Sequence, residues 1–255
     1  MNVVSRTRYR ARLEDGPTDR NRALALRQQC FRPHDPGHDD SDAHDALCRH
    51  LMVEDVATGG LAACCRLLVL QDGREMAASY SARHYDLAAL SAYPAPMMEV
   101  GRFCIDPTCQ DIDVLRVAWG ALTVLVTRFG IQMLFGCSSF AGATVPQHGA
   151  ALAWLASNHR APEIWAPRRS SGRVYGQDRV AVDARDAAAG AACLPPLLRS
   201  YLAMGGWVSD HAVIDHDLDT IHVFTGLEIA AIPAPRARAL RALATEIASC
   251  GFSGD

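Results

Sequence analysis

Strand-like and helix-like patterns follow one another along this chain in an order that few folds can accommodate. The first pattern, at residues 8–13, alternates arginine with apolar or aromatic residues and predicts a strand with an arginine-rich outer face. Further strands are expected at residues 50–56, 61–70, 97–106, 132–138, 207–214 and 220–229. Helices are expected at residues 18–32, 84–90, 112–129, 145–156, 195–204 and 234–248. This order indicates a mixed α/β (α+β) fold in one domain, residues 1–255.

All 25 basic residues are arginines, and lysine is absent. A lysine amine is required for Schiff-base chemistry, for pyridoxal phosphate enzymes and for the G-x-x-x-x-G-K-[ST] phosphate loop. Those classes of enzyme are therefore excluded. The formal net charge of −3 also argues against a dedicated nucleic-acid-binding protein.

The nine cysteines indicate a reducing compartment, because their number is odd and no C-x-x-C pair occurs. We find neither an apolar N-terminal leader nor an apolar stretch of the roughly 20 residues that span a membrane. The sequence therefore predicts a cytoplasmic protein. The aspartate-rich loop at residues 34–45 lacks the D-x-D-x-D-G calcium pattern, so we expect no bound metal.

Glu99 and Arg102 lie three residues apart in the strand expected at 97–106, where regular geometry would point them to opposite faces. Gly101 between them is a candidate for a bulge that re-aims one side chain. Amides left unpaired by such a bulge could hold a thioester carbonyl and its oxyanion. Glu99 could then accept a proton from an amine nucleophile, although a structural ion pair is an equally simple interpretation.

The turn at residues 107–114 contains no glycine and carries Asp111 and Asp113 at the start of the next helix. Their carboxylates would occupy the helix N-terminus that a phosphate-binding loop leaves open. A ligand with several phosphates, such as coenzyme A, is therefore not expected. A single phosphodiester could be bound by Arg116.

Residues 136–142 form a segment of small residues after a strand and invite a nucleophile interpretation. They fail the G-x-S-x-G pattern because Phe140 replaces the second glycine. Cys137 and His148 could still form a thiol–imidazole pair, so a Cys- or Ser-dependent thioesterase stays open as an alternative. More often such a small-residue turn lets a ligand or another backbone approach closely.

Three sequence blocks together resemble a known family. They are Met-Glu-Val-Gly-Arg-Phe at 98–103, Phe-Gly-Cys-Ser-Ser-Phe at 135–140 and Leu-Pro-Pro-Leu-Leu-Arg at 194–199. The family is the bacterial ornithine–acyl-carrier-protein N-acyltransferases, which make lyso-ornithine lipid, and the likeness runs from about Tyr9 to Ile232. Because these enzymes belong to the GNAT superfamily, the resemblance implies a GNAT-like central mixed sheet, flanked by helices and splayed between its fourth and fifth strands.

A more distant similarity connects the chain to the acyl-homoserine-lactone synthases, which also take acyl groups from acyl carrier protein. The matching positions are Arg27, Phe31, Asp42, Asp45, Arg66, Glu99, Arg102 and Phe103. The resemblance implies that an arginine binds the carboxylate of the amino acid and that Asp42 or Asp45 binds its side-chain ammonium. It also implies that Glu99 assists deprotonation of the α-amine.

The resemblance implies an enzyme that moves a 3-hydroxyacyl group from acyl carrier protein to the α-amine of L-ornithine, the first step of ornithine lipid biosynthesis. The carrier's phosphopantetheine delivers the acyl group, so no separate cofactor is expected. The expected catalytic residues are Glu99, Gly101 and Arg102. Substrate binding is expected from Arg27, Phe31, Asp42, Asp45, Arg66, Phe103, Phe135, Ser138 and Ser139, with Met97, Met98 and Leu122 along the acyl path. Carrier docking is expected at Arg8, Arg10 and Arg116.

Other acceptor amines remain open at this point, namely glutamine, glycine and lysine, because no residue identifies the amine. A non-catalytic carrier- or membrane-docking module is a further alternative. Arginine-rich surfaces suit an acidic protein or an anionic membrane, so peripheral contact with the inner face of a membrane is expected as an accessory property.

Overall fold

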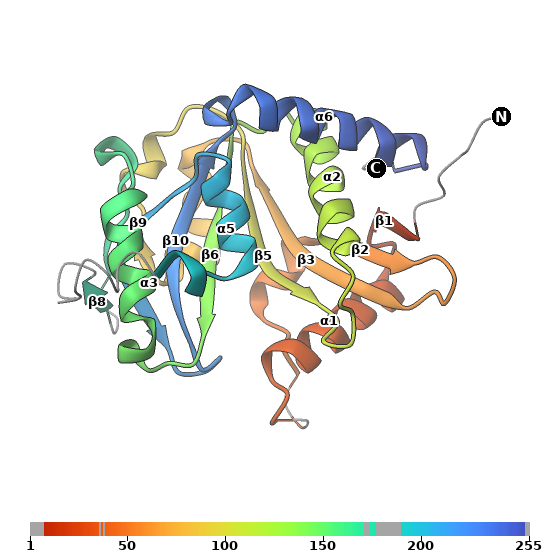
Figure 1. Cartoon of the computed structure of the whole chain (residues 1–255), viewed down its shortest axis with the longest axis horizontal. Coiled ribbons are helices and arrows are strands. Elements are labelled where there is room, and N and C mark those ends of the chain that lie inside the picture. The colour runs from red at the N-terminus through yellow and green to blue at the C-terminus, as the bar shows by residue number, and fades with distance from the viewer. Residues whose placement is uncertain (1–7, 36, 38, 171–173, 177–189, 253–255) are drawn as a thin grey trace. The chain divides into compact units, whose positions relative to one another are not determined.

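The computed structural model describes residues 8–35, 37, 39–170, 174–176 and 190–252 (Figure 1). These residues group into two compact units. Unit 1 comprises the described residues up to Leu68, Val100–Gly130 and those from Ala234 onward; unit 2 comprises Val69–Glu99 and Ile131–Pro233. Strand β5, Met97–Ile105, contributes its first part to unit 2 and the part from Val100 to unit 1.

The sheet of unit 1 has the strand order β1-β2-β3-β5. Its other strands are β1 (Tyr9–Leu13), β2 (Arg49–Asp55) and β3 (Leu61–Leu70). β1 and β2 are antiparallel, as are β2 and β3. Side chains alternate along β1, where Tyr9 and Ala11 are buried and Arg10 is exposed, so the expected period of two is confirmed.

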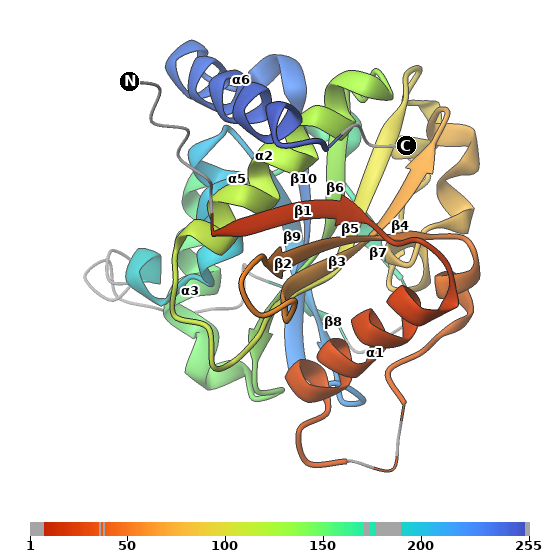
Figure 2. The ribbon, with the colours of Figure 1, turned by 90° about the vertical axis from the view of Figure 1, so that its right-hand side faces the viewer.

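Helices α1 (Pro17–Phe31) and α2 (Asp113–Arg128) pack on this sheet, and α6 (Ala234–Ser249) packs on α2. Figure 2 shows α1 on one side of β1 and β2, and α2 with α6 on the other. The arginine face of β1 is the side that meets α1, because Arg12 forms an ion pair with Asp19 of that helix. Gly130 follows the C-cap residue of α2, and its φ of 60° is the left-handed conformation that commonly terminates a helix.

The sheet of unit 2 continues from β5 in the order β5-β6-β10-β9-β8. The bounds of its strands are Met133–Ala141 for β6, Thr220–Glu228 for β10, Trp207–Asp215 for β9 and Val174–Gly176 for β8. β5 and β6 are parallel, and the remaining neighbours are antiparallel. Helices α3 (Val145–Asn158) and α5 (Pro196–Ala203) share a buried core with Val223 of β10.

Two local expectations are wrong. The helix expected at residues 84–90 is instead strand β4, Tyr85–Asp86, paired with β7, Arg168–Arg169, and followed by a 3-10 turn at Leu90–Ala92. Tyr85 is buried and its hydroxyl bonds His222 of β10, a contact far away along the chain that the local pattern of residues 84–90 could not indicate. The small-residue segment at 136–142 is strand β6 as far as Ala141, since it pairs with β10 along its whole length.

The mixed α/β class with a large sheet flanked by helices is confirmed. The expectation of a single domain stays a prediction, because both compact units contain part of β5. None of the helices in the described ranges is long and apolar enough to cross a bilayer.

Candidate functional site

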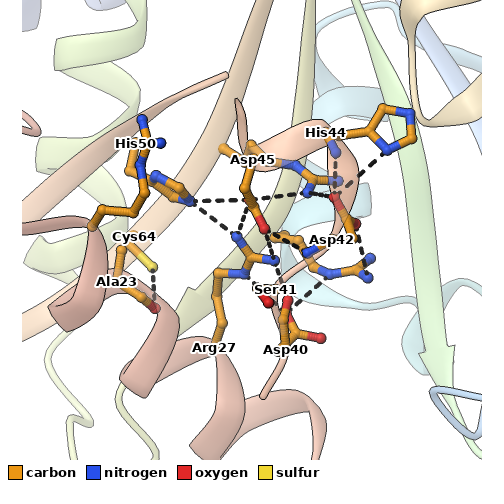
Figure 3. A network of polar contacts seen from close by, with 12 residues as sticks. Ala23, Arg27, Asp40, Ser41, Asp42, His44, Asp45, His50 and Cys64 are labelled. Carbon is orange, nitrogen blue, oxygen red and sulfur yellow. Dashed lines mark hydrogen bonds and ion pairs between the residues drawn. The ribbon is translucent and has the colours of Figure 1, made fainter. Parts of the chain in front are cut away.

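Charged side chains are buried together in unit 1 (Figure 3), with Arg27 of α1 at the centre. All five N–H groups of Arg27 are engaged within 3.3 Å, by Asp40, Asp45 and His50. Its side chain is 0% exposed. The geometry therefore favours a structural role over the predicted binding of a substrate carboxylate. We call the following set the ion cluster: Arg27, Asp40, Asp42, Asp45, His50, Arg66 and Arg102.

Asp42 and Asp45 hold each other in a reciprocal capping box around the 3-10 turn Ala43–Ala46. Arg66 joins them, because its Nη1 donates to Asp42 Oδ1 at 2.6 Å and to Asp45 Oδ1 at 3.1 Å. Burial opposes ionisation of Asp45, but the hydrogen bonds and charge of Arg27 prevail and lower its pKa to about 2. Four of the predicted residues, Arg27 included, therefore meet in one charged, hydrogen-bonded site.

His50 is a member of the ion cluster that the sequence did not single out. Its Nε2 lies 3.0 Å from Arg27 Nη1, and its Nδ1 lies 2.8 Å from Glu14 Oε2. Because a guanidinium only donates, Nε2 is the acceptor and Nδ1 carries the proton shared with Glu14. Burial lowers the pKa of His50 against the influence of Glu14, which keeps the imidazole neutral within the cluster.

Arg102 departs from regular strand geometry directly after Gly101, the residue at which a bulge was predicted. Its φ is 50°, in the left-handed region, whereas Gly101 is not among the positive-φ glycines of the described chain. Arg102 Nε donates to Asp40 Oδ2 at 3.2 Å, and its guanidinium lies 5.7 Å from the centre of the Phe31 ring. The bulge expected at Gly101 stays a prediction, and the left-handed backbone of Arg102 brings its guanidinium to the predicted Phe31. Phe103, the next residue of β5, is half-buried.

Asp42, like Asp40, has an oxygen that accepts no hydrogen bond from a described residue, but it is the more exposed of the two. Its Oδ2 accepts no hydrogen bond from any described residue, and the ion-pair contact to Arg102 Nη2 is 3.7 Å long. The Asp42 side chain is 17% exposed, compared with 8% for Asp45 and 0% for Asp40. Of the two aspartates predicted to bind an ammonium group, the geometry favours Asp42.

Glu99 lies in unit 2, where a short turn holds its carboxylate. Oε2 accepts the Tyr80 amide at 2.9 Å, and Oε1 accepts the Ser81 amide at 2.8 Å and the Ser81 hydroxyl at 2.6 Å. Ser81 is 0% exposed and Glu99 is 5% exposed. A carboxylate has about four lone-pair sites, so one acceptor position on Oε2 is left by these three bonds.

Strand β6 divides the predicted substrate-binding residues between its two faces. Phe135 and Cys137 share one face, where the Phe135 ring stacks on Phe224 at 5.9 Å and Cys137 Sγ lies 3.6 Å from Ser81 Oγ. Ser139 belongs to that face by alternation and is exposed. Ser138 lies on the opposite face, where its Oγ accepts a hydrogen bond from Thr225 at 2.8 Å. Of the serines, only Ser139 therefore shares a face with Phe135.

The face of Phe135 continues onto β9 and β10 as a hydrogen-bonded aromatic layer. The Tyr85 hydroxyl donates to the His222 carbonyl at 2.9 Å, and burial raises the pKa of Tyr85 well above its ordinary value. An irregularity in β9 lets Ser209 Oγ accept the Phe224 amide at 3.1 Å and donate to the His211 carbonyl at 2.6 Å. His211 and His222 are buried in this layer.

The three arginines predicted to dock the carrier are engaged in ion pairs within unit 1. Arg8 contacts Asp55 at 2.8 Å, Arg10 contacts Glu54 at 3.4 Å, and Arg116 contacts Glu246 at 2.8 Å. Arg8 and Arg10 still have more than half of their side chains exposed. Docking at these positions stays a prediction.

The sequence did not single out Asp40, Glu14, His50, Ser81 and Tyr85. Asp40 was one of several aspartates in one loop, and nothing in its spacing set it apart. The other four take their partners from segments far away along the chain, so local pattern carries no signal for them. No group of three or more metal-ligating side chains occurs within the described ranges.

Comparison of the sequence with known protein families identifies the class of protein to which this chain belongs. Residues 26–120 match the family described as acetyltransferase (GNAT) domain. The match contains the ion cluster and Glu99, and it accompanies a mixed sheet flanked by helices. The fold and the site define an acyltransferase of the GNAT class.

The relatives make the assignment more specific. The chain is 32% identical to the L-ornithine N(alpha)-acyltransferase of Rhodobacter capsulatus over 189 residues, covering 72% of either protein. It is 30% identical to the protein of that name from Brucella abortus over 197 residues, covering 74% of this chain and 70% of the relative. FeeM, an N-acyl amino acid synthase from uncultured soil microbes, aligns with a TM-score of 0.47 and 13% identity over 93% of this chain and 98% of its own. The chain belongs to the L-ornithine N(alpha)-acyltransferase family, which confirms the resemblance stated from sequence.

Proposed function

We propose that the chain transfers a 3-hydroxyacyl group from acyl carrier protein to the α-amine of L-ornithine, giving lyso-ornithine lipid. Membership of the family carries this proposal, because the relatives are named for acylation of that amine. The amine nitrogen attacks the thioester carbonyl carbon, the C–S bond breaks, and the carrier leaves as its free thiol. The proton that the amine loses is balanced by the proton gained on sulfur.

In this proposal Glu99 is the first acceptor of the amine proton. The ammonium form of the amine has no lone pair, so a nearby carboxylate must take a proton before or during attack. The acceptor position left on Oε2 supports this role, because the other three positions are filled by the Tyr80–Ser81 turn. We assign stabilisation of the oxyanion to strand amides near Gly101 and Arg102, as predicted from sequence.

The start of α2 supports a carrier protein over coenzyme A as donor. Asp111 Oδ1 accepts the Asp113 amide at 3.0 Å, and the Val114 amide bonds the Asp111 carbonyl at 3.3 Å. The amides that could cradle a pyrophosphate are thus engaged by the chain's own carboxylate and carbonyl. A donor with one phosphodiester, held by contacts between two proteins, needs no such cradle.

We assign the side-chain ammonium of ornithine to Asp42, whose Oδ2 has no hydrogen bond within the described residues. Arg66 or Arg102, rather than the saturated Arg27, would meet the substrate carboxylate. Exposed arginines such as Arg8 and Arg10 are assigned to docking of the acidic carrier and to peripheral contact with the inner face of the membrane. The enzyme would then act in the cytoplasm on a free amino acid.

A thioesterase based on Cys137 finds little support in the geometry. His148 packs its ring 5.2 Å from Phe140, and its Nε2 lies 2.9 Å from the Gly142 carbonyl. Phe140 belongs to the core under α3, whereas Cys137 lies on the opposite face of β6. The predicted thiol–imidazole pair would therefore have to form across the sheet.

Mass spectrometry of a reaction with 3-hydroxyacyl carrier protein and a panel of free amino acids tests the proposal. We expect N-acylornithine with release of carrier thiol, and little product from 3-hydroxyacyl coenzyme A. Glu99→Gln should lower kcat by about 10²- to 10⁴-fold, the usual contribution of a general base. The control is Glu75→Gln, because Glu75 also accepts a backbone amide in unit 2, from Gln71 at 2.8 Å, but lies at the surface.

Acylation of glutamine, glycine or lysine instead of ornithine would replace the substrate and keep the chemistry. Release of free fatty acid without any amide, abolished by Cys137→Ala, would establish the thioesterase. Normal turnover by a folded Glu99→Gln variant would remove the base assignment. Carrier binding without turnover would leave a docking module.

A further inference from the structure

The Tyr80–Ser81 turn holds Glu99 more tightly than a solvent-exposed carboxylate is held. Two backbone amides and one hydroxyl meet its two oxygens at 2.6–2.9 Å. Ser81 Oγ supplies the shortest of these bonds, to Oε1. Charge-assisted bonds of this length are stronger than neutral ones and fix the plane of the carboxylate.

The Ser81 hydroxyl also has its own orientation fixed. Because its hydrogen points to Glu99, its lone pairs face the Cys137 thiol, whose Sγ lies 3.6 Å away. The thiol is therefore the donor in that contact. The Cys137 thiol donates to the Ser81 hydroxyl, which in turn donates to the Glu99 carboxylate. A hydroxyl held on both sides cannot rotate away from the carboxylate without losing a bond.

We propose that Ser81 is a positioning residue for acyl transfer: it holds Oε1 of Glu99 so that Oε2 receives the proton of the attacking amine. The inference rests on the proposed function, since it requires Glu99 to act as the base. Ser81 is 0% exposed and lies behind the carboxylate, so it acts through Glu99 and does not itself meet substrate.

The position of Ser81 has two consequences for the reaction. A carboxylate held in one plane presents Oε2 in one direction, and misplacing a catalytic group by about 1 Å can cost 10²-fold in rate. A donor to Oε1 also stabilises the charged carboxylate, so losing that donor makes the group hold a proton more tightly. Removal of the hydroxyl should therefore change both kcat and its dependence on pH.

The test compares Ser81→Ala with Ser79→Ala in the full-length enzyme. Ser79 is a matched control, because it is also 0% exposed and lies two residues away, where its hydroxyl donates to the Met76 carbonyl at 2.8 Å and accepts the Ala82 amide at 3.2 Å, without contacting Glu99. We expect Ser81→Ala to lower kcat by about 10- to 100-fold with KM for both substrates nearly unchanged. The acidic limb of its kcat–pH profile should move to higher pH. Ser79→Ala should change neither quantity, whatever it does to stability.

Ser81→Cys and Ser81→Thr complete the series. Cysteine has nearly the shape of serine but a weak donor, so its kcat should fall between those of the wild type and Ser81→Ala. Threonine keeps the hydroxyl and should restore the acidic limb of the profile in the folded fraction. If Ser81→Ala fails to fold, the kcat values and pH profiles of these two variants test the positioning role of the Ser81 hydroxyl.

A Ser81→Ala enzyme with the kcat and pH profile of Ser79→Ala would overturn the positioning role and leave the proposed function standing. Wild-type enzyme that transfers no acyl group to any amine would overturn both. Acyl transfer to a different amino acid, with the same loss of kcat in Ser81→Ala, would support Ser81 while changing the substrate.

Discussion

Arg27 and its partners show how a charge can be buried in unit 1. All five donors of the guanidinium are satisfied, and two carboxylates and a neutral imidazole surround it. Such a group contributes little net stability compared with apolar packing, but removing one partner leaves the others buried without compensation. The cost of substitution therefore depends on what stays behind.

We expect Arg27→Met to lower the free energy of unfolding by about 3–5 kcal/mol, because Asp40 and Asp45 would stay buried without their main donor. Urea denaturation followed by circular dichroism would measure the change. Arg10→Met is the control, since its single long ion pair to Glu54 is at the surface, and it should cost about 1 kcal/mol or less. Equal losses for the two variants would contradict a structural role for Arg27.

At the scale of the element, β5 departs from regular strand geometry at Arg102. A non-glycine residue in the left-handed region costs roughly 1–2 kcal/mol, and it persists only where its surroundings hold it. Here the bond to Asp40 and the Phe31 ring provide that hold. The strand therefore keeps a strained residue at a position that places a charged side chain in the ion cluster.

A pair of substitutions separates this backbone strain from loss of the side chain. Arg102→Ala and Arg102→Gly both remove the guanidinium, but only glycine adopts a φ of 50° without steric cost. We expect the glycine variant to be more stable than the alanine variant by about 1 kcal/mol in urea denaturation. At Phe103, which is not among the positive-φ residues, alanine should be more stable than glycine by roughly 0.5–1 kcal/mol. The same order at both positions would exclude strain at Arg102.

At the scale of the whole molecule, unit 1 concentrates the carboxylates that ion pairs keep ionised. Hydrogen bonds from Arg12 lower the pKa of Glu54 to about 2 from a usual 4.5, and the pKa of Asp45 falls to about 2 from 3.8 against the effect of burial. A carboxyl with a lowered folded pKa stabilises the protein above its unfolded pKa and loses that contribution as pH falls through the folded value. In the described part of unit 2, the hydrogen bond from Arg74 also lowers the pKa of Asp72, but this pair lies at the surface.

We therefore expect acid to weaken unit 1 first, between about pH 4.5 and pH 2. Hydrogen exchange at pH 6 and pH 3, corrected for intrinsic rates, should show loss of protection in peptides from β1 and β2. Peptides from β9 and β10 should keep their protection at pH 3. Simultaneous loss in both units would contradict this expectation and would favour the single cooperative domain predicted from sequence.

Much of the fold and part of the candidate site could be read from sequence. The helix stripe that became α2 and the alternation that became β1 depend on local periodicity, because hydrophobic spacing alone decides which side of an element is buried. The block containing Glu99 and Arg102 was predictable because its spacing matches a family. The aspartate loop was recognised as a site, but its members could not be ranked, since several aspartates offer the same chemistry within a few positions.

The sequence by itself determined the class of fold, the absence of lysine chemistry and the family. The tertiary structure alone decided how each charged group is used: Arg27 is saturated, Asp42 keeps a spare oxygen, and Ser81 holds Glu99. It also gave Arg102 a left-handed backbone and replaced the helix expected at 84–90 with strand β4. The physical reason is that periodicity is a local property, whereas burial and hydrogen-bond partners come from residues distant along the chain, such as Ser81 and Glu99 or Tyr85 and His222.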